Sequence, residues 1–244
     1  MESLIFSFLL SPNALLIIAA VLPAFLLLLY VYRRDRLEPE PRRLLLFLLL
    51  WGVAATFLAV LSESVGAILL AYFLPGGENS FAYGVWMYFV VVALSEEGFK
   101  YLFLRWRTWR SPEFNCRFDG VVYAVFVSLG FALAENIGYV LMYGLGAALM
   151  RAITAVPGHA SFGVFMGAYY GLARSSENQG RHSLSVFWRV LAVLVPTLIH
   201  GMYDYIAVNE ESLFSPTFVV FVLAVFGLAF VLIRRLSKRD EYIA

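Results

Sequence analysis

Long apolar stretches dominate the chain, and short charged segments separate them. The apolar windows fall near residues 14–32, 44–62, 82–104, 119–143, 152–173, 187–207 and 216–234. Each window is about 20 residues long, which lets a helix cross roughly 30 Å of hydrocarbon. The pattern therefore predicts an all-α polytopic membrane protein with about seven transmembrane helices. These helices are expected to form a single integral membrane domain over residues 1–244.

Composition agrees with this prediction, because 61% of the 244 residues are hydrophobic and 14% are charged. A formal net charge of +1 gives no reason to expect a nucleic-acid partner. A single cysteine, Cys116, excludes an internal disulfide and a cysteine-based metal cluster. The first 32 residues lack a basic n-region, so we interpret them as a retained first span and not as a cleaved signal peptide.

Charges in the linkers predict the orientation. Residues 33–43, 105–117 and 174–182 and the C-terminal segment carry more basic than acidic side chains, whereas the linkers between them are acidic or neutral. Glu63 and Glu78 supply the charge of the 63–80 linker, and Glu210 and Glu211 that of the linker before the last window. The short 144–151 connection carries Arg151 and is uninformative. The positive-inside rule then places the N-terminus outside and the C-terminus in the cytoplasm.

Four of the windows carry polar side chains that the hydrocarbon should reject, at about 2.5 to 3.5 kcal/mol for each ionisable group. They are Glu96, Glu97 and Lys100 in the third window, Glu135 and Asn136 in the fourth, His159 in the fifth, and His200 and Asp204 in the sixth. The other three windows carry almost no polar side chains of this kind. This asymmetry predicts a central polar cavity between four helices, with three lipid-facing helices around it.

Depth and spacing indicate how these groups meet. Counting from the linkers at about 1.5 Å per residue places Glu135, His159 and His200 at one level and the two glutamates of the third window deeper. A kink, a tilt or a wide cavity is therefore needed to bring all of them together. Lys100 lies one helical turn from that glutamate pair, and Asp204 lies one turn from His200.

Each group also has a purely structural explanation. The glutamates and Lys100 could form a neutralised lock between helices, His200 with Asp204 a hydrogen-bonded clasp, and His159 a polar helix end. Asp119 is interpreted as an N-cap or interfacial residue. Close helix packing is predicted for two series of small residues, Gly163, Gly167 and Gly171, and Gly130, Ala134 and Gly138. A structural lock would need far fewer polar groups than these four windows supply, which favours chemistry.

Histidine and carboxylate side chains together can activate water. Two neighbouring carboxylates in a low dielectric cannot both ionise cheaply, so one would hold a proton while the other acts as a base. The histidines could donate to an oxyanion in a metal-free site, or they could bind zinc, with Glu135, His159 and His200 as donors. The depth of Glu96 and the charge of Lys100 favour the metal-free site.

Several motifs, in this order along residues 33–207, resemble those of the PrsW family of intramembrane proteases. They are "DRLEPEP", "SEEGFK", "FALAEN", "PGHASFG" and "HGMYD". That family is similar in turn to the type II CAAX prenyl endopeptidases and to the APH-1 subunit of gamma-secretase. The resemblance implies a protease of the bacterial cytoplasmic membrane whose partner is a single-span membrane substrate. It would make the site-1 cut in an anti-sigma factor, near the extracytoplasmic side.

The resemblance also assigns roles to residues of this chain. Glu96 is expected to be the water-activating base, while Glu135 and His159 hold the water or a metal. His200 is expected to stabilise the oxyanion. Asp204 stands where the prenyl endopeptidases have an asparagine of the oxyanion hole, and since a carboxylate donates poorly, Asp204 is expected to orient His200. The remaining candidates are Glu97 as a further catalytic residue and Lys100 and Asn136 as supporting residues.

Two other classes of protein could bury such groups. A proton-coupled transporter would show inverted repeats and broken spans in both halves, and neither is evident in this sequence. A non-catalytic scaffold similar to APH-1 would keep the histidines but would not need the adjacent glutamates Glu96 and Glu97.

Overall fold

The computed structural model describes residues 12–74, 80–209 and 215–243. Its helical elements are α2 (Pro12–Tyr32), α3 (Arg42–Phe73), α4 (Phe81–Val85), the π-helix η1 (Trp86–Ala93), α5 (Leu94–Thr108), α6 (Asp119–Ile153), α7 (Ala155–Asn178), α8 (His182–Asn209) and α9 (Pro216–Lys238). These described ranges contain no strand, only one isolated bridge between Cys116 and Tyr242. The acidic linker residues Glu78, Glu210 and Glu211, and the start of the interpreted first span, lie outside the described residues.

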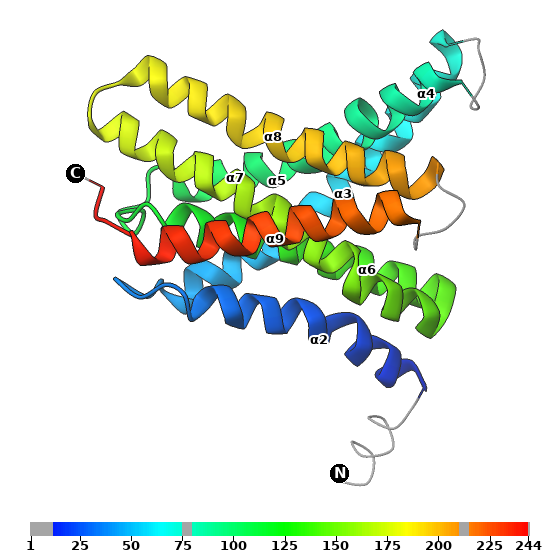
Figure 1. Ribbon diagram of the computed structural model, residues 1–244, viewed down its shortest axis with the longest axis horizontal. Helices are drawn as coiled ribbons and strands as arrows, with labels where there is room; N and C mark the ends of the chain where they lie inside the picture. The colour runs from blue at the N-terminus through cyan, green and yellow to red at the C-terminus, as the bar shows by residue number, and fades with distance from the viewer. Residues whose placement is uncertain (1–11, 75–79, 210–214, 244) are drawn as a thin grey trace, which may run out of the picture.

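The prediction of an all-α polytopic membrane protein is confirmed. Four helical stretches are long and apolar enough to cross a membrane, namely Arg42–Phe73, Asp119–Asn178, His182–Asn209 and Pro216–Lys238. The second of these stretches contains both α6 and α7, and Leu16–Tyr32 is a shorter apolar helix. All seven predicted windows lie on helix, with α4, η1 and α5 together forming the third (Figure 1).

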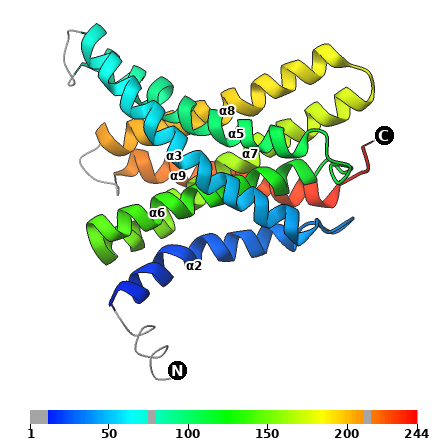
Figure 2. The same cartoon turned by 180° about the vertical axis from the view of Figure 1, so that it is seen from behind.

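The helices run roughly side by side, so the linkers gather at two opposite ends of the molecule. The α2–α3 linker, the α5–α6 loop, the α7–α8 turn and the C-terminus lie at one end, in both views of the ribbon (Figures 1 and 2). We call this the basic end, because the predicted basic linkers are there. The end of α3, the start of α4, the end of α8 and the start of α9 lie at the opposite end, as the predicted alternation requires.

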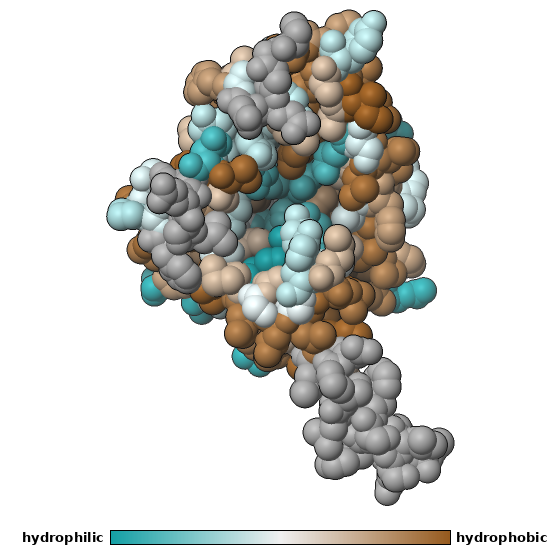
Figure 3. All heavy atoms as spheres, turned by 90° about the vertical axis from the view of Figure 1, so that its right-hand side faces the viewer, coloured by the Kyte–Doolittle hydropathy of each residue, from teal (hydrophilic) through white to brown (hydrophobic). Residues whose placement is uncertain are grey.

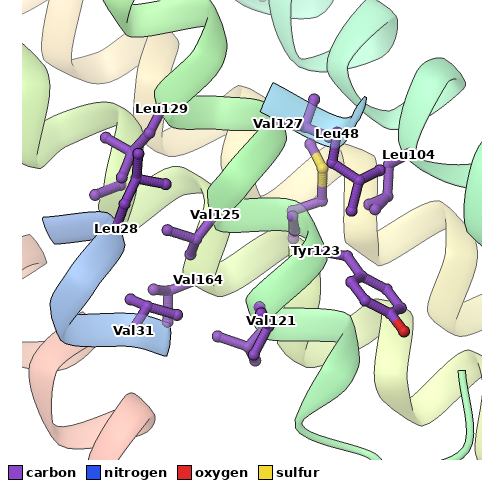
Figure 4. Close-up of a cluster of buried hydrophobic side chains, with 14 of the residues drawn as sticks. Leu28, Val31, Leu48, Leu104, Val121, Tyr123, Val125, Val127, Leu129 and Val164 are labelled. Atoms are coloured by element: carbon purple, nitrogen blue, oxygen red, sulfur yellow. The ribbon is translucent and has the colours of Figure 1, made fainter. Parts of the chain in front are cut away.

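Helix α6 forms the centre of the hydrophobic core. Between Asp119 and Ala132 almost every side chain is buried, and α2, α3, α5 and α7 surround this half of the helix. Figure 4 shows Leu28 of α2, Leu48 of α3 and Leu104 of α5 beside the valines of α6. Large apolar side chains cover the outer face of the bundle, as expected for surfaces in contact with lipid. Among the most exposed are Phe57, Ile68, Met142, Val220 and Leu223.

Glycines let these helices approach closely. A Cβ added at Gly130 of α6 would lie 2.0 Å from the carbonyl oxygen of Leu49 in α3. One added at Gly167 of α7 would lie 2.4 Å from the Cα of Val121 in α6. The predicted packing role is therefore confirmed at these positions. It is wrong for Gly138, whose added Cβ would have nothing within 4 Å.

Two departures from regular α-helix were not evident in the sequence. Residues 86–93 form the π-helix η1, whose wider turns advance less along the axis per residue. Gly144 has φ 76° and ψ −162°, a backbone conformation that glycine adopts without a steric penalty. The helix is interrupted at Gly144, and a second helical segment follows over 145–153. The predicted 144–151 connection is therefore largely helical.

One prediction about an acidic residue was wrong, and one of the two alternatives predicted for another is excluded. Helix α3 continues to Phe73, so Glu63 lies inside a helix and not in a linker. Asp119 is not an N-cap, because the N-cap of α6 is Phe118 and has no side-chain hydrogen bond. The Asp119 side chain is fully buried and accepts hydrogen bonds from the preceding backbone N–H groups of Asn115 and Cys116.

Candidate active site

A polar cavity of about 260 Å³ lies between α3, η1, α5, α6, α7 and α8. It appears in Figure 3 as a hydrophilic hollow at the end of the molecule opposite the basic end. A cavity of this size has room for several water molecules. Its charged and histidine lining consists of Glu63, Glu96, Glu135, Arg151, His159, His200 and Asp204. Tyrosines 88, 139 and 203 contribute to the same wall.

Lys100 is the centre of the polar network beneath this cavity. Its fully buried ammonium donates to Glu96 Oε2 at 3.1 Å and to Glu97 Oε1 at 2.8 Å. A third contact, of 3.1 Å, joins Lys100 Nζ to His159 Nδ1, and the ammonium also lies 4.0 Å from the ring centroid of Phe131. One cation therefore compensates two buried carboxylates and fixes a histidine on another helix.

The contacts of His159 determine which ring nitrogen carries the proton. Because an ammonium has donors only, Nδ1 of His159 accepts from Lys100, and the proton is on Nε2. Nε2 then donates to Glu135 Oε2 at 2.8 Å. A chain of contacts thus runs from α5 through α7 to α6, and Glu135 ends it at the cavity wall.

His200 lies between two carboxylates. Its Nδ1 is 2.9 Å from Glu97 Oε1, and its Nε2 is 3.3 Å from Asp204 Oδ2 one turn further along α8. Both nitrogens can donate at once only in the imidazolium form, so this environment favours a charged ring. The ring stacks on Phe162, with 4.6 Å between centroids, which fixes its plane.

The two adjacent glutamates occupy different positions, as their separation of about 100° around a helix requires. Glu97 is fully buried, contacts both Lys100 and His200, and does not line the cavity. Glu96 lines the cavity and lies 3.9 Å from His200 Nδ1. Of the pair, Glu96 is the one that can reach a bound substrate or water.

Asn136 lies outside the cavity lining, and its contacts point to a structural role. Its Nδ2 donates to the carbonyl oxygen of Ala20 at 2.7 Å, which joins α6 to α2. Its Oδ1 accepts from Arg151 Nε at 3.0 Å, while Arg151 Nη2 lies 3.3 Å from Glu135 Oε2. Asn136 therefore holds the arginine that contacts Glu135.

Sequence reasoning missed Arg151 and Glu63 as members of the site. Arg151 reaches Glu135 because the chain turns back at Gly144, and hydropathy alone does not reveal that break. Glu63 reaches the cavity because α3 continues for ten residues beyond it. The apolar run "VGAILLAYF" after Glu63 was the available signal for a longer helix.

The predicted difference in depth between the glutamates and the histidines is absent from the structure. Glu96 lies within 4 Å of His200, and Lys100 contacts both the glutamates and His159. The π-helix η1 immediately precedes α5 and advances less per residue than the α-helical count assumed. That shorter rise brings the glutamates toward the level of the histidines.

The donor atoms suit a metal ion by type. Glu96, His159 and His200 each place one ligand atom within 4.8 Å of the others, and two nitrogens with one carboxylate is a donor set that zinc accepts. Each histidine also contacts a further carboxylate, Glu135 or Asp204, which is typical of metal-binding histidines. The zinc ligands predicted from the sequence were Glu135, His159 and His200, so the structure replaces Glu135 with Glu96 in this group. Lys100 lies among these groups, and its positive charge would repel a divalent cation bound there.

Comparison with known proteins gives one consistent result. The family model described as "PrsW family intramembrane metalloprotease" matches residues 40–232. The protein named Protease PrsW of Bacillus subtilis (strain 168) is 34% identical over 85% of this chain and 90% of its own length. Proteins of the same name from Geobacillus kaustophilus and Halalkalibacterium halodurans are 35% and 31% identical, over 80% and 93% of this chain and 81% and 99% of their own lengths. No solved structure gives a significant match.

Proposed function

The chain belongs to the PrsW family of intramembrane metalloproteases and is a multi-pass bacterial membrane protease, and from this premise we propose that it cuts a single-span anti-sigma factor. The observation that carries the proposal is the polar cavity lined by Glu96 at one end of the bundle. The basic end lies opposite, and the positive-inside rule assigns that end to the cytoplasm. The cavity then opens toward the extracytoplasmic side, and the cut falls near that side of the bilayer.

In the proposed reaction Glu96 takes a proton from a water molecule in the cavity. The water oxygen bonds to the carbonyl carbon of the substrate, and the Nδ1–H of His200 turns from Glu97 to donate to the oxyanion that forms. The carbon–nitrogen bond then breaks, and the proton held by Glu96 passes to the leaving amine. Asp204 holds the His200 ring in the donating orientation, and Glu135 with His159 positions the water.

The family description also implies a metal, and the chain offers Glu96, His159 and His200 to hold it. A zinc ion held there would supply a Lewis acid, which makes water far easier to deprotonate near neutral pH. Glu96 would then be a ligand, and Glu135, which borders the cavity beside His159, would be a carboxylate placed to accept the proton. Lys100 would have to leave its contacts with Glu96 and His159.

Reconstitution tests the substrate class. Purified protein in lipid vesicles is mixed with a panel of single-span anti-sigma proteins, and each soluble ectodomain, without its span, serves as the matched control. We expect cleavage of at least one membrane-anchored protein, at a bond that mass spectrometry places near the extracytoplasmic end of the span. Cleavage of the ectodomains at equal rates, or a cut near the cytoplasmic end, would contradict the proposal.

The same assay distinguishes the two forms of the mechanism. A metal-dependent site loses activity with chelator, contains about one zinc ion per chain by elemental analysis, and recovers when zinc returns. A metal-free site keeps its activity in chelator.

A further inference from the structure

A second polar cluster lies at the basic end, remote from the cavity. Asp35 and Glu40 belong to the linker between α2 and α3, and Asp119 is the first residue of α6. These side chains are 5%, 4% and 0% exposed, and each places an oxygen within 4.8 Å of the others. Asp119 and Glu135 are 16 residues apart on α6, about 24 Å at 1.5 Å per residue, so this cluster is separate from the catalytic candidates.

Backbone N–H groups hold one oxygen of two of these acids in place. Asp119 Oδ2 accepts from Asn115 N at 3.0 Å and from Cys116 N at 2.6 Å, and Asp35 Oδ2 accepts from Glu40 N at 3.2 Å. The other oxygens, Asp35 Oδ1 and Asp119 Oδ1, are buried and have no hydrogen-bond partner in the described part of the chain. Glu40 Oε2 is also buried and has no hydrogen-bond partner among the described residues.

The charged groups with the largest effect on these carboxyls are other acids. The groups that act on Asp35 are Asp240 and Glu38, and those that act on Glu40 include Asp119 and Asp35. No ion pair among the described residues involves Asp35, Glu40 or Asp119. Burying unpaired charge costs several kcal/mol per ion, so a cation bound between these acids would stabilise the arrangement.

We propose that Asp35, Glu40 and Asp119 bind a hard divalent cation of the Mg²⁺ or Ca²⁺ type. Carboxylate oxygens are the donors that such cations prefer, and backbone N–H groups already hold the Asp35 and Asp119 side chains in place. Asp240 extends the site to the C-terminal tail, because it belongs to a second close group with Asp119 and also has a buried, unpartnered oxygen. The cation joins the α2–α3 linker, the start of α6 and the tail.

The test measures cation binding and not proteolysis. The full chain is purified in detergent, treated with chelator, and titrated with Mg²⁺ or Ca²⁺ while thermal unfolding is followed. We expect the unfolding midpoint of the unmodified protein to rise saturably. Elemental analysis at saturation should find about one hard cation per chain. Asp35→Asn and Glu40→Gln should raise the cation concentration needed for half of the effect by at least roughly tenfold.

Two matched variants separate this site from nonspecific and catalytic binding. Glu38 lies in the same linker but is exposed and is not a proposed ligand, so Glu38→Gln should shift the titration far less than Asp35→Asn or Glu40→Gln. Glu96→Gln, in the cavity, should also keep the response. Two results would overturn the proposal: an unmodified protein that binds no cation, or an unchanged titration after Glu40→Gln.

A measurement on the unmodified chain covers the case in which the variants do not fold. Terbium, a luminescent cation that prefers oxygen donors, is bound to the chelator-treated protein and then displaced by Ca²⁺. We expect one displaceable terbium ion per chain. Absence of displacement would indicate that the acids are neutralised by shared protons instead, which would also overturn the proposal.

Discussion

The Nζ of Lys100 lies 2.8 Å from Glu97 Oε1, and neither side chain is exposed. The same ammonium lies 3.1 Å from Glu96 Oε2. Inside a bundle that excludes water, removing one partner of such a group leaves the others charged and uncompensated. The cation is therefore a condition for burying the acids, whatever chemistry those acids perform.

Replacing this cation should damage the fold more than the chemistry. Lys100→Met keeps most of the side-chain volume but leaves Glu96 and Glu97 without their counter-charge, and we expect it to reduce the free energy of unfolding by about 3 to 5 kcal/mol. Unfolding in mixed micelles measures the change. Lys238→Met, at an exposed position near the end of α9, is the matched control and should be neutral. A fully stable Lys100→Met protein would show that the acids are not charged together.

The proposed base can be tested by a change of one atom. Glu96→Gln keeps the shape of the side chain and removes the carboxylate, so cleavage should fall by at least roughly a hundredfold. Single-turnover cleavage in vesicles gives the rate, and thermal unfolding shows whether the variant is folded. Glu38→Gln, an exposed change of the same chemistry, should cleave normally. Unchanged cleavage by folded Glu96→Gln protein would exclude Glu96 as the base.

Much of the site could be predicted from the sequence, because charge in an apolar helix is costly and therefore conspicuous. Glu96, Lys100, His159 and His200 were found in this way, and the structure brings them into one network. Their sequence positions did not reveal the pairing. Which nitrogen of His159 faces Lys100 depends on packing between helices.

The parts of the site that the sequence did not predict depend on backbone geometry, which a hydropathy pattern does not reveal. Arg151 was set aside as part of a short connection, and only the break at Gly144 turns it toward Glu135. Asp119 was interpreted as a helix cap, because its acidic neighbours Asp35 and Glu40 are distant in sequence and come together only in the folded chain. Such errors arise where the chain changes direction.

Helix packing offers a test that does not involve the cavity. Gly167→Ala places a methyl group against the backbone of α6 and should destabilise the protein by about 1 to 3 kcal/mol. Gly138→Ala is the matched control, because an added Cβ there has nothing within 4 Å. That control should be neutral or stabilising by about 0.5 to 1 kcal/mol, since alanine favours helix. Equal effects of the two variants would contradict the close approach of α6 and α7.

The proposed orientation predicts a labelling pattern. With Cys116 replaced by serine, a cysteine in place of Arg181, in the α7–α8 turn, should react with a membrane-impermeant reagent only after the cytoplasmic face is exposed. A cysteine in place of Asn209, at the exposed end of α8, should react in intact cells. The opposite pattern at these two positions would reverse the assigned orientation.

The π-helix η1 makes the length of one segment as important as its composition. Residues 86–93 are apolar apart from Tyr88, so many exchanges between similar side chains would leave their hydrophobic character unaltered. Removing any single residue there would instead shift the register of α5 by one residue and rotate it relative to the helix before it. Glu96 would then turn out of the cavity although every residue of the catalytic cluster was still present. A deletion in this segment can therefore inactivate the enzyme while all its motifs remain intact.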